Sequence, residues 1–468
     1  MYLQRLNSLW FLLTASKSKL MIAFRIIILL LLVIAVGRLI QVYSGNFYSG
    51  ERQPYLQSMS SDSVVIRWQT AEKMRGQLHY GVHPAKLDQL ITETSEAEEH
   101  QVKLSALSAD TQYYYAIGNE SRLLWQGPKY RFRTALPAGS EQPVRVWVLG
   151  DPGYNSEQHH KVRDSMLNWV EQHPRKNRPA YDLIMTTGDN AYRSGTNQQF
   201  QQNFFNLYSD IFTSTVVWPL YGNHDARRWA FFNIFSFPEN AEAGGVASHS
   251  ERYYSFDFGN VHFVMLDSFD GAKDQDDEML VWLKKDLALN NSRWLVAALH
   301  HPPYSKGNQD SDDQSDSRGR LFNSRQNIVP VLEKYGVDLV LSGHSHSYER
   351  SHLIDCHYGL ASSFNSAMLA AKAETDPLSA IRHYTKSAKT RAHQGAIFAV
   401  VGSTAKLNRQ GSFDHPAMDV GLAEYGSFVL DIEADTMTGR FINQNGQQRD
   451  AFVVKKDSKQ ETFVSSCQ

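Results

Sequence analysis

Cysteine is almost absent from this chain of 468 residues, which contains only Cys356 and Cys467. Two cysteines exclude a disulfide scaffold and a cysteine-based zinc site. A metal ion would therefore be held by His, Asp, Asn or Tyr side chains. Outside the cytoplasm the two cysteines could pair and tether the C-terminal end, or both could remain free thiols.

An excess of basic charge is also lacking. The formal net charge is -2, and Lys and Arg residues form no cluster along the chain. Because a nucleic-acid-binding surface normally needs clustered basic residues, we expect no such surface. The length favours two to three domains, and the 42% of hydrophobic residues is enough for sizeable cores.

One apolar run stands apart near the N-terminus, from Ile26 to Gly37, with basic residues before it. Its length matches a cleaved signal peptide with a small-residue site at Gly37. Counted from Leu20 to Val42, the segment could instead anchor the chain in a membrane. Either interpretation of residues 1–45 predicts that everything after about residue 43 is exported. Translation could also begin at Met21.

Short alternating segments follow, and they predict an all-β sandwich at residues 50–136. They are Ser63–Trp68, Gly76–Tyr80, Glu99–Leu104, Thr111–Ile117 and Tyr130–Thr134. Their spacing and the polar turns between them are typical of a sandwich, in which we expect Trp68 to be a core residue. The segment Leu136–Pro143 is interpreted as a linker.

The pattern changes after Val144 to apolar runs separated mostly by segments of helical length. The expected strands are Val144–Leu149, Leu183–Thr187, Val216–Leu220, Val261–Leu266, Trp294–Leu299, Val337–Leu341, Ala396–Val401, Ser427–Ile432 and Arg440–Asn443. The expected helices are Glu157–Gln172, Asp276–Leu289 and Asn323–Tyr335. This alternation predicts an α/β domain at residues 144–450, with an antiparallel hairpin at Arg252–Asp267 and a charged tail at 451–468.

Possible metal ligands follow five of these strands. The segments are Gly150-Asp151-Pro152-Gly153, Gly188-Asp189-Asn190-Ala191-Tyr192, Gly222-Asn223-His224-Asp225, His300-His301-Pro302 and Gly343-His344-Ser345-His346. Open α/β sheets place ligands beyond the carboxyl ends of their strands. The five segments therefore predict one shared metal site.

These five segments resemble the motifs of purple acid phosphatases in the metallophosphoesterase superfamily, and the similarity covers roughly Gln53 to Asn445. The resemblance implies an α+β sandwich catalytic domain behind a fibronectin type III-like module. It implies Fe(III) bound by Asp151, Asp189, Tyr192 and His346. It also implies a divalent ion, Zn, Mn or Fe(II), bound by Asp189, Asn223, His300 and His344.

The residue types agree with that division. Two carboxylates, a phenol oxygen and one imidazole form a hard anionic set that suits a trivalent ion. The other set has two imidazoles, an amide and the shared carboxylate, which suits a softer divalent ion. Tyr192 decides the subfamily, because Gly153 stands where most metallophosphoesterases carry a histidine.

The implied reaction is hydrolysis of a small phosphate ester. Two cations about 3.5 to 4 Å apart can clamp phosphoryl oxygens and generate the hydroxide that attacks phosphorus in line. His224 is the first candidate for the acid that protonates the leaving oxygen, and His301 is the second.

Two other functions fit the same sequence. A phosphodiesterase or nucleotide hydrolase would use the same ligands, and a surface binding protein would use the β-sandwich beside a vestigial site. Every predicted ligand position holds a suitable residue, whereas a vestigial site should have lost at least one, and this counts against the surface binding protein. The polar segment Ser305–Arg320 is expected to shape the substrate entrance, and residues 357–395 form an insert with no predicted role.

Overall fold

The computed structural model describes residues 19, 21–37, 39–40, 45, 47–226, 229–272, 274–375, 381–388, 392–459 and 467. The chain divides into two compact units, Met1–Tyr48 and Ser49–Gln468. In the first unit, residues 21–37 are helical and their apolar side chains are exposed. Within the described ranges, no helix is both long and apolar enough to cross a membrane.

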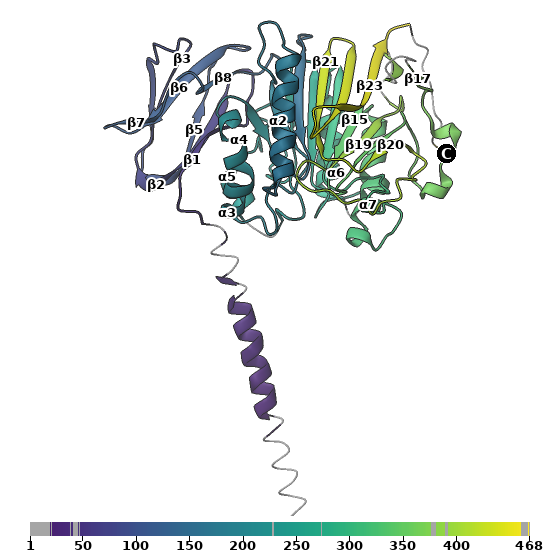
Figure 1. Cartoon of the computed structure of the whole chain (residues 1–468), viewed down its shortest axis with the longest axis horizontal. Coiled ribbons are helices and arrows are strands. Elements are labelled where there is room, and N and C mark those ends of the chain that lie inside the picture. The colour runs from purple at the N-terminus through teal and green to yellow at the C-terminus, as the bar shows by residue number, and fades with distance from the viewer. Residues whose placement is uncertain are drawn as a thin grey trace, which may run out of the picture. The chain divides into compact units, whose positions relative to one another are not determined.

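The second unit begins with a β-rich part, which lies at the left of Figure 1. Its strands are β1 (Arg52–Gln57), β2 (Val64–Met74), β3 (Gln77–Gly81), β4 (Gln89–Thr92), β5 (Ala97–Leu104), β6 (Gln112–Gly118), β7 (Leu123–Trp125) and β8 (Arg131–Arg133). All five strands predicted here form, with ends shifted by a few residues. Trp68 is fully buried, as predicted, and its ring stacks on His100 at 4.8 Å between centroids.

The first large sheet has the strand order β17-β18-β23-β22-β21-β9-β10-β11-β1-β2-β5. Its members beyond the β-rich part are β9 (Val144–Leu149), β10 (Leu183–Thr186), β11 (Val216–Trp218), β17 (Glu374–Thr375), β18 (Arg382–Ser387), β21 (Gly426–Glu433), β22 (Thr436–Asn443) and β23 (Gln448–Asp457). Strand β1 pairs in parallel with β11, with Leu56 opposite Val216. The N-terminal strands therefore extend the sheet that carries β9 and β10.

The second large sheet has the order β12-β13-β14-β15-β19-β16-β20. Its strands are β12 (Tyr254–Phe258), β13 (Val261–Leu266), β14 (Trp294–Leu299), β15 (Leu339–Ser342), β16 (Tyr348–Ser351), β19 (Ile397–Val401) and β20 (Met418–Leu422). Strands β13, β14, β15 and β19 are parallel. The predicted hairpin is confirmed, because β12 and β13 pair antiparallel.

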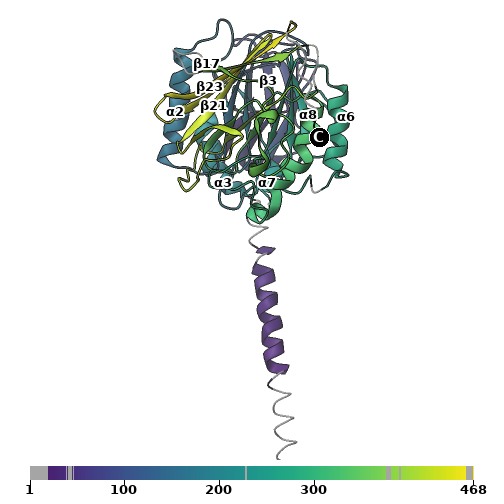
Figure 2. The same cartoon turned by 90° about the vertical axis from the view of Figure 1, so that its right-hand side faces the viewer.

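The two sheets pack face to face and helices cover their outer faces. In β9, Val146 and Val148 join the core between the sheets, whereas Trp147 and Leu149 pack with α2 on the other side. A strand buried on both faces is apolar at nearly every position, which explains the almost continuous apolar run in the sequence. The exception in β9 is Arg145, which pairs with Asp431 at 2.6 Å. Figure 2 shows α2 on one side of the molecule and α6 and α8 on the other.

The covering elements fall into two groups. Beside the first sheet lie α2 (Glu157–Gln172), α3 (Asn197–Phe200), the π-turn Gln201–Phe205, α4 (Asn206–Phe212) and α5 (Ala230–Ile234). Beside the second lie α6 (Glu278–Leu289) and α8 (Val329–Lys334). Shorter turns are the 3₁₀ turns Asp316–Gly319, Ala361–Ser363 and Ser366–Met368, α7 (Arg320–Asn323) and the π-turn Ser324–Ile328.

The structure differs from the sequence-based expectation near the C-terminus. The charged segment expected to be a tail forms strand β23 up to Asp457. Ala451, Phe452 and Val454 of this strand are buried in the first sheet. The alternation was concealed by Lys455 and Lys456, whose charge suggested a solvated segment. Residues of the predicted insert supply β17 and β18, and β18 pairs with β23.

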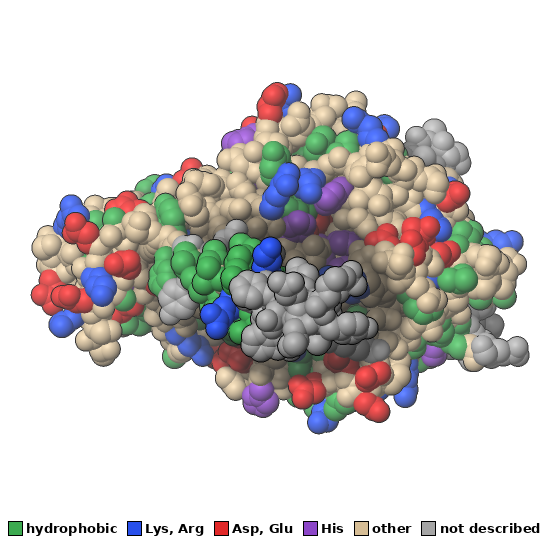
Figure 3. Space-filling model, turned by 90° about the horizontal axis from the view of Figure 1, so that it is seen from below, with side chains coloured by type: hydrophobic (Ala, Val, Ile, Leu, Met, Phe, Trp, Pro, Cys, Tyr) green, Lys and Arg blue, Asp and Glu red, His purple; other side chains and the backbone are tan. Residues whose placement is uncertain are grey.

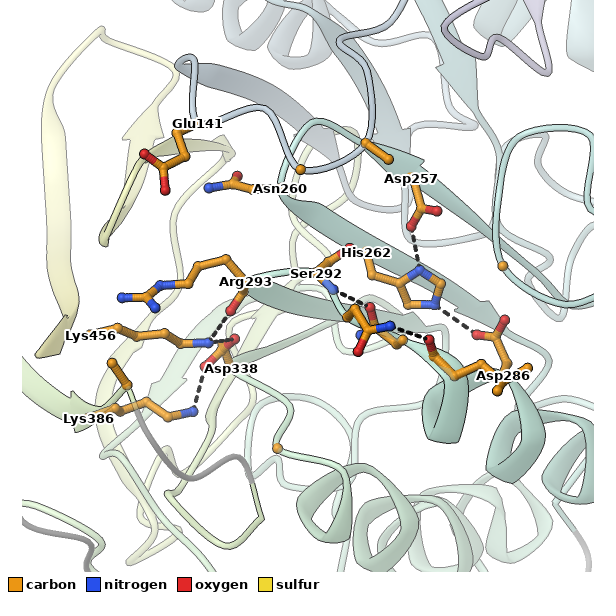
Figure 4. Close-up of a pocket in the computed structure, with 18 of the residues that line it drawn as sticks. Glu141, Asp257, Asn260, His262, Asp286, Ser292, Arg293, Asp338, Lys386 and Lys456 are labelled. Carbon is orange, nitrogen blue, oxygen red and sulfur yellow. Dashed lines mark hydrogen bonds and ion pairs between the residues drawn. The ribbon is translucent and has the colours of Figure 1, made fainter. Parts of the chain in front are cut away.

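A cavity of about 650 Å³ lies where β13, β14 and β15 begin, at the edge opposite their carboxyl ends. Figure 4 shows two groups of paired charges on its wall. Lys386 and Lys456 share Asp338, with distances of 2.6 and 2.7 Å. His262 lies between the carboxylates of Asp257 and Asp286, at 2.6 and 2.8 Å. We therefore assign these groups to the stability of the fold.

The protonation of His262 should make the stability of the fold depend on pH. Burial opposes its protonation, but hydrogen bonds to Asp257 and Asp286 outweigh burial and raise the pKa of His262 to about 9. The unfolded value is near 6.5. Protonated His262 therefore contributes up to about 3 kcal/mol to the free energy of unfolding. This contribution is complete below about pH 6.5 and disappears as pH rises through about 9.

Chemical denaturation of the wild type and His262→Gln from pH 6 to 10 measures this contribution. The difference in free energy of unfolding should shrink as pH rises, and the exposed His83→Gln should show no such trend. A difference that is constant with pH would contradict this assignment.

Candidate metal centre

Seven side chains predicted as ligands meet at the carboxyl ends of strands from both large sheets. They are Asp151 after β9, Asp189 and Tyr192 after β10, Asn223 after β11, His300 after β14, and His344 and His346 after β15. Figure 3 shows histidine side chains gathered around a hollow on the face seen from below in Figure 1. Residues up to 195 positions apart therefore lie in one place.

Tyr192 lies at the middle of the first group of donor atoms. Its hydroxyl oxygen is 3.1 Å from Asp151 Oδ1, 3.0 Å from Asp189 Oδ2 and 3.1 Å from His346 Nε2. The tyrosine is 4% exposed, and both carboxylates are buried. Donors that bind one ion at about 2.1 Å lie roughly 3 to 3.5 Å apart. The three distances from the Tyr192 oxygen fit this range, and His346 Nε2 lies 3.7 Å from Asp151 Oδ1, so the four donors are close enough to share one cation.

Asp189 also faces a second group. Its Oδ1 lies 3.4 Å from His300 Nε2, which in turn lies 2.9 Å from Asn223 Oδ1. The centroids of the His344 and His300 rings are 5.0 Å apart. Asp189 therefore offers one oxygen to each group of donors, which is one of the arrangements in which a carboxylate bridges two ions.

The backbone at the strand ends is held in an unusual conformation. Asp151, Asp189 and His344 have positive φ angles of 53°, 54° and 65°. Side-chain-bearing residues adopt this region at a cost of about 1 kcal/mol or more, and such residues cluster at functional sites. A hydrogen bond holds two of them together, because the His344 amide donates to Asp151 Oδ2 at 2.9 Å.

Close approach of two loops requires glycine at position 222. A Cβ atom there would lie 2.1 Å from the amide nitrogen of Asp189. Asp225, three residues later, ties the same loops together by accepting hydrogen bonds from the amides of Asn190 and Gly222. Burial raises the pKa of Asp225 to about 7, and the charge of Asp189 adds to this rise. Asp225 thus positions the ligand loops through backbone contacts.

The electrostatics of the centre favour a cation. Burial raises the pKa of Asp151 well above its usual range, and the charge of Asp189 raises it further despite the opposing charge of His300. Burial alone would raise the pKa of Asp189, but the nearby His300 outweighs burial and lowers the pKa of Asp189. Burial likewise opposes protonation of His300, yet Asp189 and Asp151 raise the pKa of His300 to about 9. The buried carboxylates thus draw positive charge toward the site, and bound cations would supply it.

The two predicted acid residues lie in different surroundings. The His224 ring is 33% exposed, its Nδ1 is 2.7 Å from the carbonyl oxygen of Arg193, and its Nε2 is 3.9 Å from Asp189 Oδ2. His301 is buried, and its Nδ1 lies 2.9 Å from Ser268 Oγ. The centroids of the His301 and His344 rings are 4.4 Å apart. Burial lowers the pKa of His301 well below its usual value, and His344 lowers it further.

Three further residues at the centre were not predicted individually. Asn308 and Ser317 come from the polar segment expected at the substrate entrance. Asn308 Oδ1 accepts from the His346 amide at 2.5 Å, and Ser317 Oγ lies 2.6 Å from His344 Nε2. Lys406 Nζ is 4.2 Å from the centre of the Tyr192 ring. Lys406 lies in the loop after β19, but lysine is not among the residue types sought as ligands, so the rule applied to the other strand ends does not select it.

Comparisons with known protein families match both parts of the second unit. Residues 144–348 match the family model described as calcineurin-like phosphoesterase. Residues 52–134 match the model described as purple acid phosphatase, N-terminal domain. The second match covers the part in which we predicted a fibronectin type III-like module.

Individual relatives agree with these models. The chain is 29% identical over 350 residues to purple acid phosphatase 15 of Arabidopsis thaliana, covering 66% of this chain and 61% of that protein. It is 26% identical over 319 residues to human acid phosphatase type 7, covering 62% of this chain and 67% of that protein. The chain thus spans less than two thirds of the Arabidopsis protein.

Solved structures show the same fold. A purple acid phosphatase from yellow lupin (Lupinus luteus) seeds superimposes with a TM-score of 0.65 at 16% identity, covering 86% of this chain and 74% of that one. The structure of PhoD gives a TM-score of 0.59 at 12% identity, covering 90% and 94%.

Proposed function

Because the chain belongs to the purple acid phosphatase family of metallophosphoesterases, we propose that it hydrolyses phosphate monoesters at the candidate metal centre. The observation that carries this proposal is the position of Asp189, which presents one oxygen to each of two groups of donors. A pair of cations held there would face the hollow in which a small phosphate ester can bind.

The proposed ions are Fe(III) in the first group and a divalent ion, Zn, Mn or Fe(II), in the second. Asp151, Tyr192 and His346 complete the first group around Asp189. Its two carboxylates and phenol oxygen are hard anionic donors, which trivalent iron prefers. The second group adds Asn223, His300 and His344 to the shared Asp189, and its lower charge suits a divalent ion.

The cations, when bound, would act as Lewis acids on the phosphoryl group and lower the pKa of water. The protein groups orient the reactants and transfer protons. The contact with the Arg193 carbonyl fixes the His224 ring, so that Nε2 can donate a proton to the leaving oxygen. We assign His301 a positioning role, because its buried neutral ring is held by Ser268. The Lys406 ammonium adds positive charge beside the anionic donors.

Export is part of the proposal. It is supported by the apolar run Ile26–Gly37 and by the disulfide between Cys356 and Cys467. Disulfides persist in oxidising compartments, whereas cytosolic thiols are kept reduced. We propose that the run acts as a signal peptide or anchor. We further propose a fibronectin type III-like sandwich at 50–136 and a catalytic domain at 144–450.

Replacing the shared carboxylate tests the proposed activity. Asp189→Asn should reduce hydrolysis of p-nitrophenyl phosphate to background, because both cation sites lose an anionic donor. Asp164→Asn, an exposed carboxylate on α2, is the control and should keep full activity. Retained activity in Asp189→Asn would place the chemistry elsewhere. Faster hydrolysis of bis(p-nitrophenyl) phosphate than of the monoester would favour a phosphodiesterase instead.

The visible spectrum tests the iron assignment. A phenolate bound to Fe(III) gives a charge-transfer band in the visible range, so the purified protein should be coloured. Tyr192→Phe should abolish the band, whereas Tyr154→Phe, an exposed tyrosine, should leave it unchanged. A colourless and fully active enzyme containing only Zn or Mn would refute the Fe(III) assignment.

The leaving group separates the roles of His224 and His301. An alkoxide must be protonated as it leaves, whereas p-nitrophenolate is stable without a proton. His224→Ala should therefore lower kcat for glycerol 2-phosphate by about 10² to 10⁴ and lower kcat for p-nitrophenyl phosphate much less. His301→Ala should affect both substrates alike. Equal losses in His224→Ala would exclude it as the general acid.

A further inference from the structure

A second group of metal-ligating side chains surrounds the disulfide, outside the candidate metal centre. It consists of Asp355, Cys356, His393 and Cys467, whose ligand atoms all lie within 4.8 Å of one another. The disulfide joins positions 111 residues apart and links the C-terminal end to the loop after β16. We call these four residues the C-terminal cluster.

We propose that the C-terminal cluster binds one Zn²⁺ ion when its disulfide is reduced. Two thiolates, an imidazole and a carboxylate are a complete set of tetrahedral zinc ligands. The phosphatase function is not needed for this inference, because none of the four residues belongs to the candidate metal centre. The inference also revises the expectation that two cysteines rule out a zinc site with cysteine ligands.

The spacing of the ligand atoms carries the proposal. His393 Nδ1 lies 3.3 Å from Cys467 Sγ, 3.9 Å from Cys356 Sγ and 3.2 Å from Asp355 Oδ1. Cys356 Sγ lies 3.4 Å from Asp355 Oδ2. Ligands of tetrahedral zinc, at the usual Zn–S, Zn–N and Zn–O distances, lie roughly 3.3 to 3.8 Å apart. The four distances lie within about 0.1 Å of this range, and the two sulfurs, which are bonded to each other, must separate to accept the ion.

Glu333 at the end of α8 holds two of the ligands in place. Its side chain accepts from the Cys356 amide at 3.0 Å, and its carbonyl oxygen accepts from the His393 amide at 3.0 Å. The Tyr358 hydroxyl donates to the same carboxylate at 2.6 Å. Glu333 is 2% exposed, so this support lies inside the fold. Ligands fixed by buried contacts lose little freedom when they bind a metal.

Zinc binding at the C-terminal cluster takes two steps, reduction of the disulfide and exchange of the thiol protons for the ion. A dithiol reductant breaks the Cys356–Cys467 bond by supplying two electrons and two protons, and is itself oxidised to a disulfide. Zn²⁺ then displaces two protons from the thiols as two Zn–S bonds form. The cluster therefore tethers the C-terminal end through a disulfide under oxidising conditions and through zinc under reducing conditions.

Cobalt(II) in the full-length protein is a probe with a sulfur-specific readout. The protein is reduced with tris(2-carboxyethyl)phosphine, which becomes its oxide as water supplies the oxygen, and the reagent is removed without air. The reduced protein should then show a thiolate-to-cobalt charge-transfer band, which Zn²⁺ removes, and the oxidised protein should show none. The candidate metal centre contains no sulfur ligand, so it cannot produce this band.

Variants identify the ligands. His393→Ala should weaken cobalt binding in the reduced protein at least about tenfold. His383→Ala on β18 is the control and should leave the band and the affinity unchanged. Equal cobalt affinity in His393→Ala and the wild type would overturn the proposed ligand set.

A measurement without substitutions guards against variants that fail to fold. Zn²⁺ should slow alkylation of both cysteines by iodoacetamide at least tenfold in the reduced wild type, as followed by mass spectrometry. Alkylation at the same rate with and without Zn²⁺, together with no cobalt band, would show that the pair serves only as a disulfide.

Discussion

The buried carboxylates of Asp151 and Asp189 are the constraint on which the rest of the site depends. Two like charges removed from water destabilise the fold unless positive charge lies close to them. The structure brings His300 to Asp189 and places further imidazole, amide and phenol groups around the pair. A site of this kind is completed by cations, and the same cations suit the proposed hydrolysis of phosphate esters.

The fold meets this constraint by bringing strand ends from two sheets to one place. Parallel strands β9 and β10 deliver Asp151 and Asp189, and β14 and β15 of the other sheet deliver the histidines. Positive φ angles at Asp151, Asp189 and His344 turn these side chains at the ends of their strands. The packed core between the sheets compensates for the strain, so the ligands are positioned before any ion binds.

The two cysteines give the molecule a second feature of the same chemical kind. Asp355 and His393 lie beside the disulfide, and Glu333 holds the loops that carry Cys356 and His393. Both sites combine buried carboxylates with imidazoles, but only the C-terminal cluster contains sulfur. The difference in donor atoms would let the two sites select different metals and respond to different conditions.

The sequence alone predicted the strands that precede the motif residues, the antiparallel hairpin and the motif residues themselves, because periodicity and residue order are local properties. Apolar runs such as Trp294–Leu299 are buried on both faces, and the ligand-type residues lie in the loops that follow the strands. Strand β23 was missed because Lys456 gave its segment the charge of a tail, although Asp338 pairs with this lysine inside the fold. That pairing joins positions 118 residues apart, so no local pattern contains it.

Only the tertiary structure decided which residues outside the motifs reach the two sites. It brought Asn308 and Ser317 to the histidines, Lys406 to Tyr192, and His393 to the cysteines. These contacts depend on how loops fold across the ends of the sheets, and loop paths follow from long-range packing more than from the local sequence. The sequence therefore determined the chemistry that is available to this protein, and the packing of its two sheets determined where that chemistry is assembled.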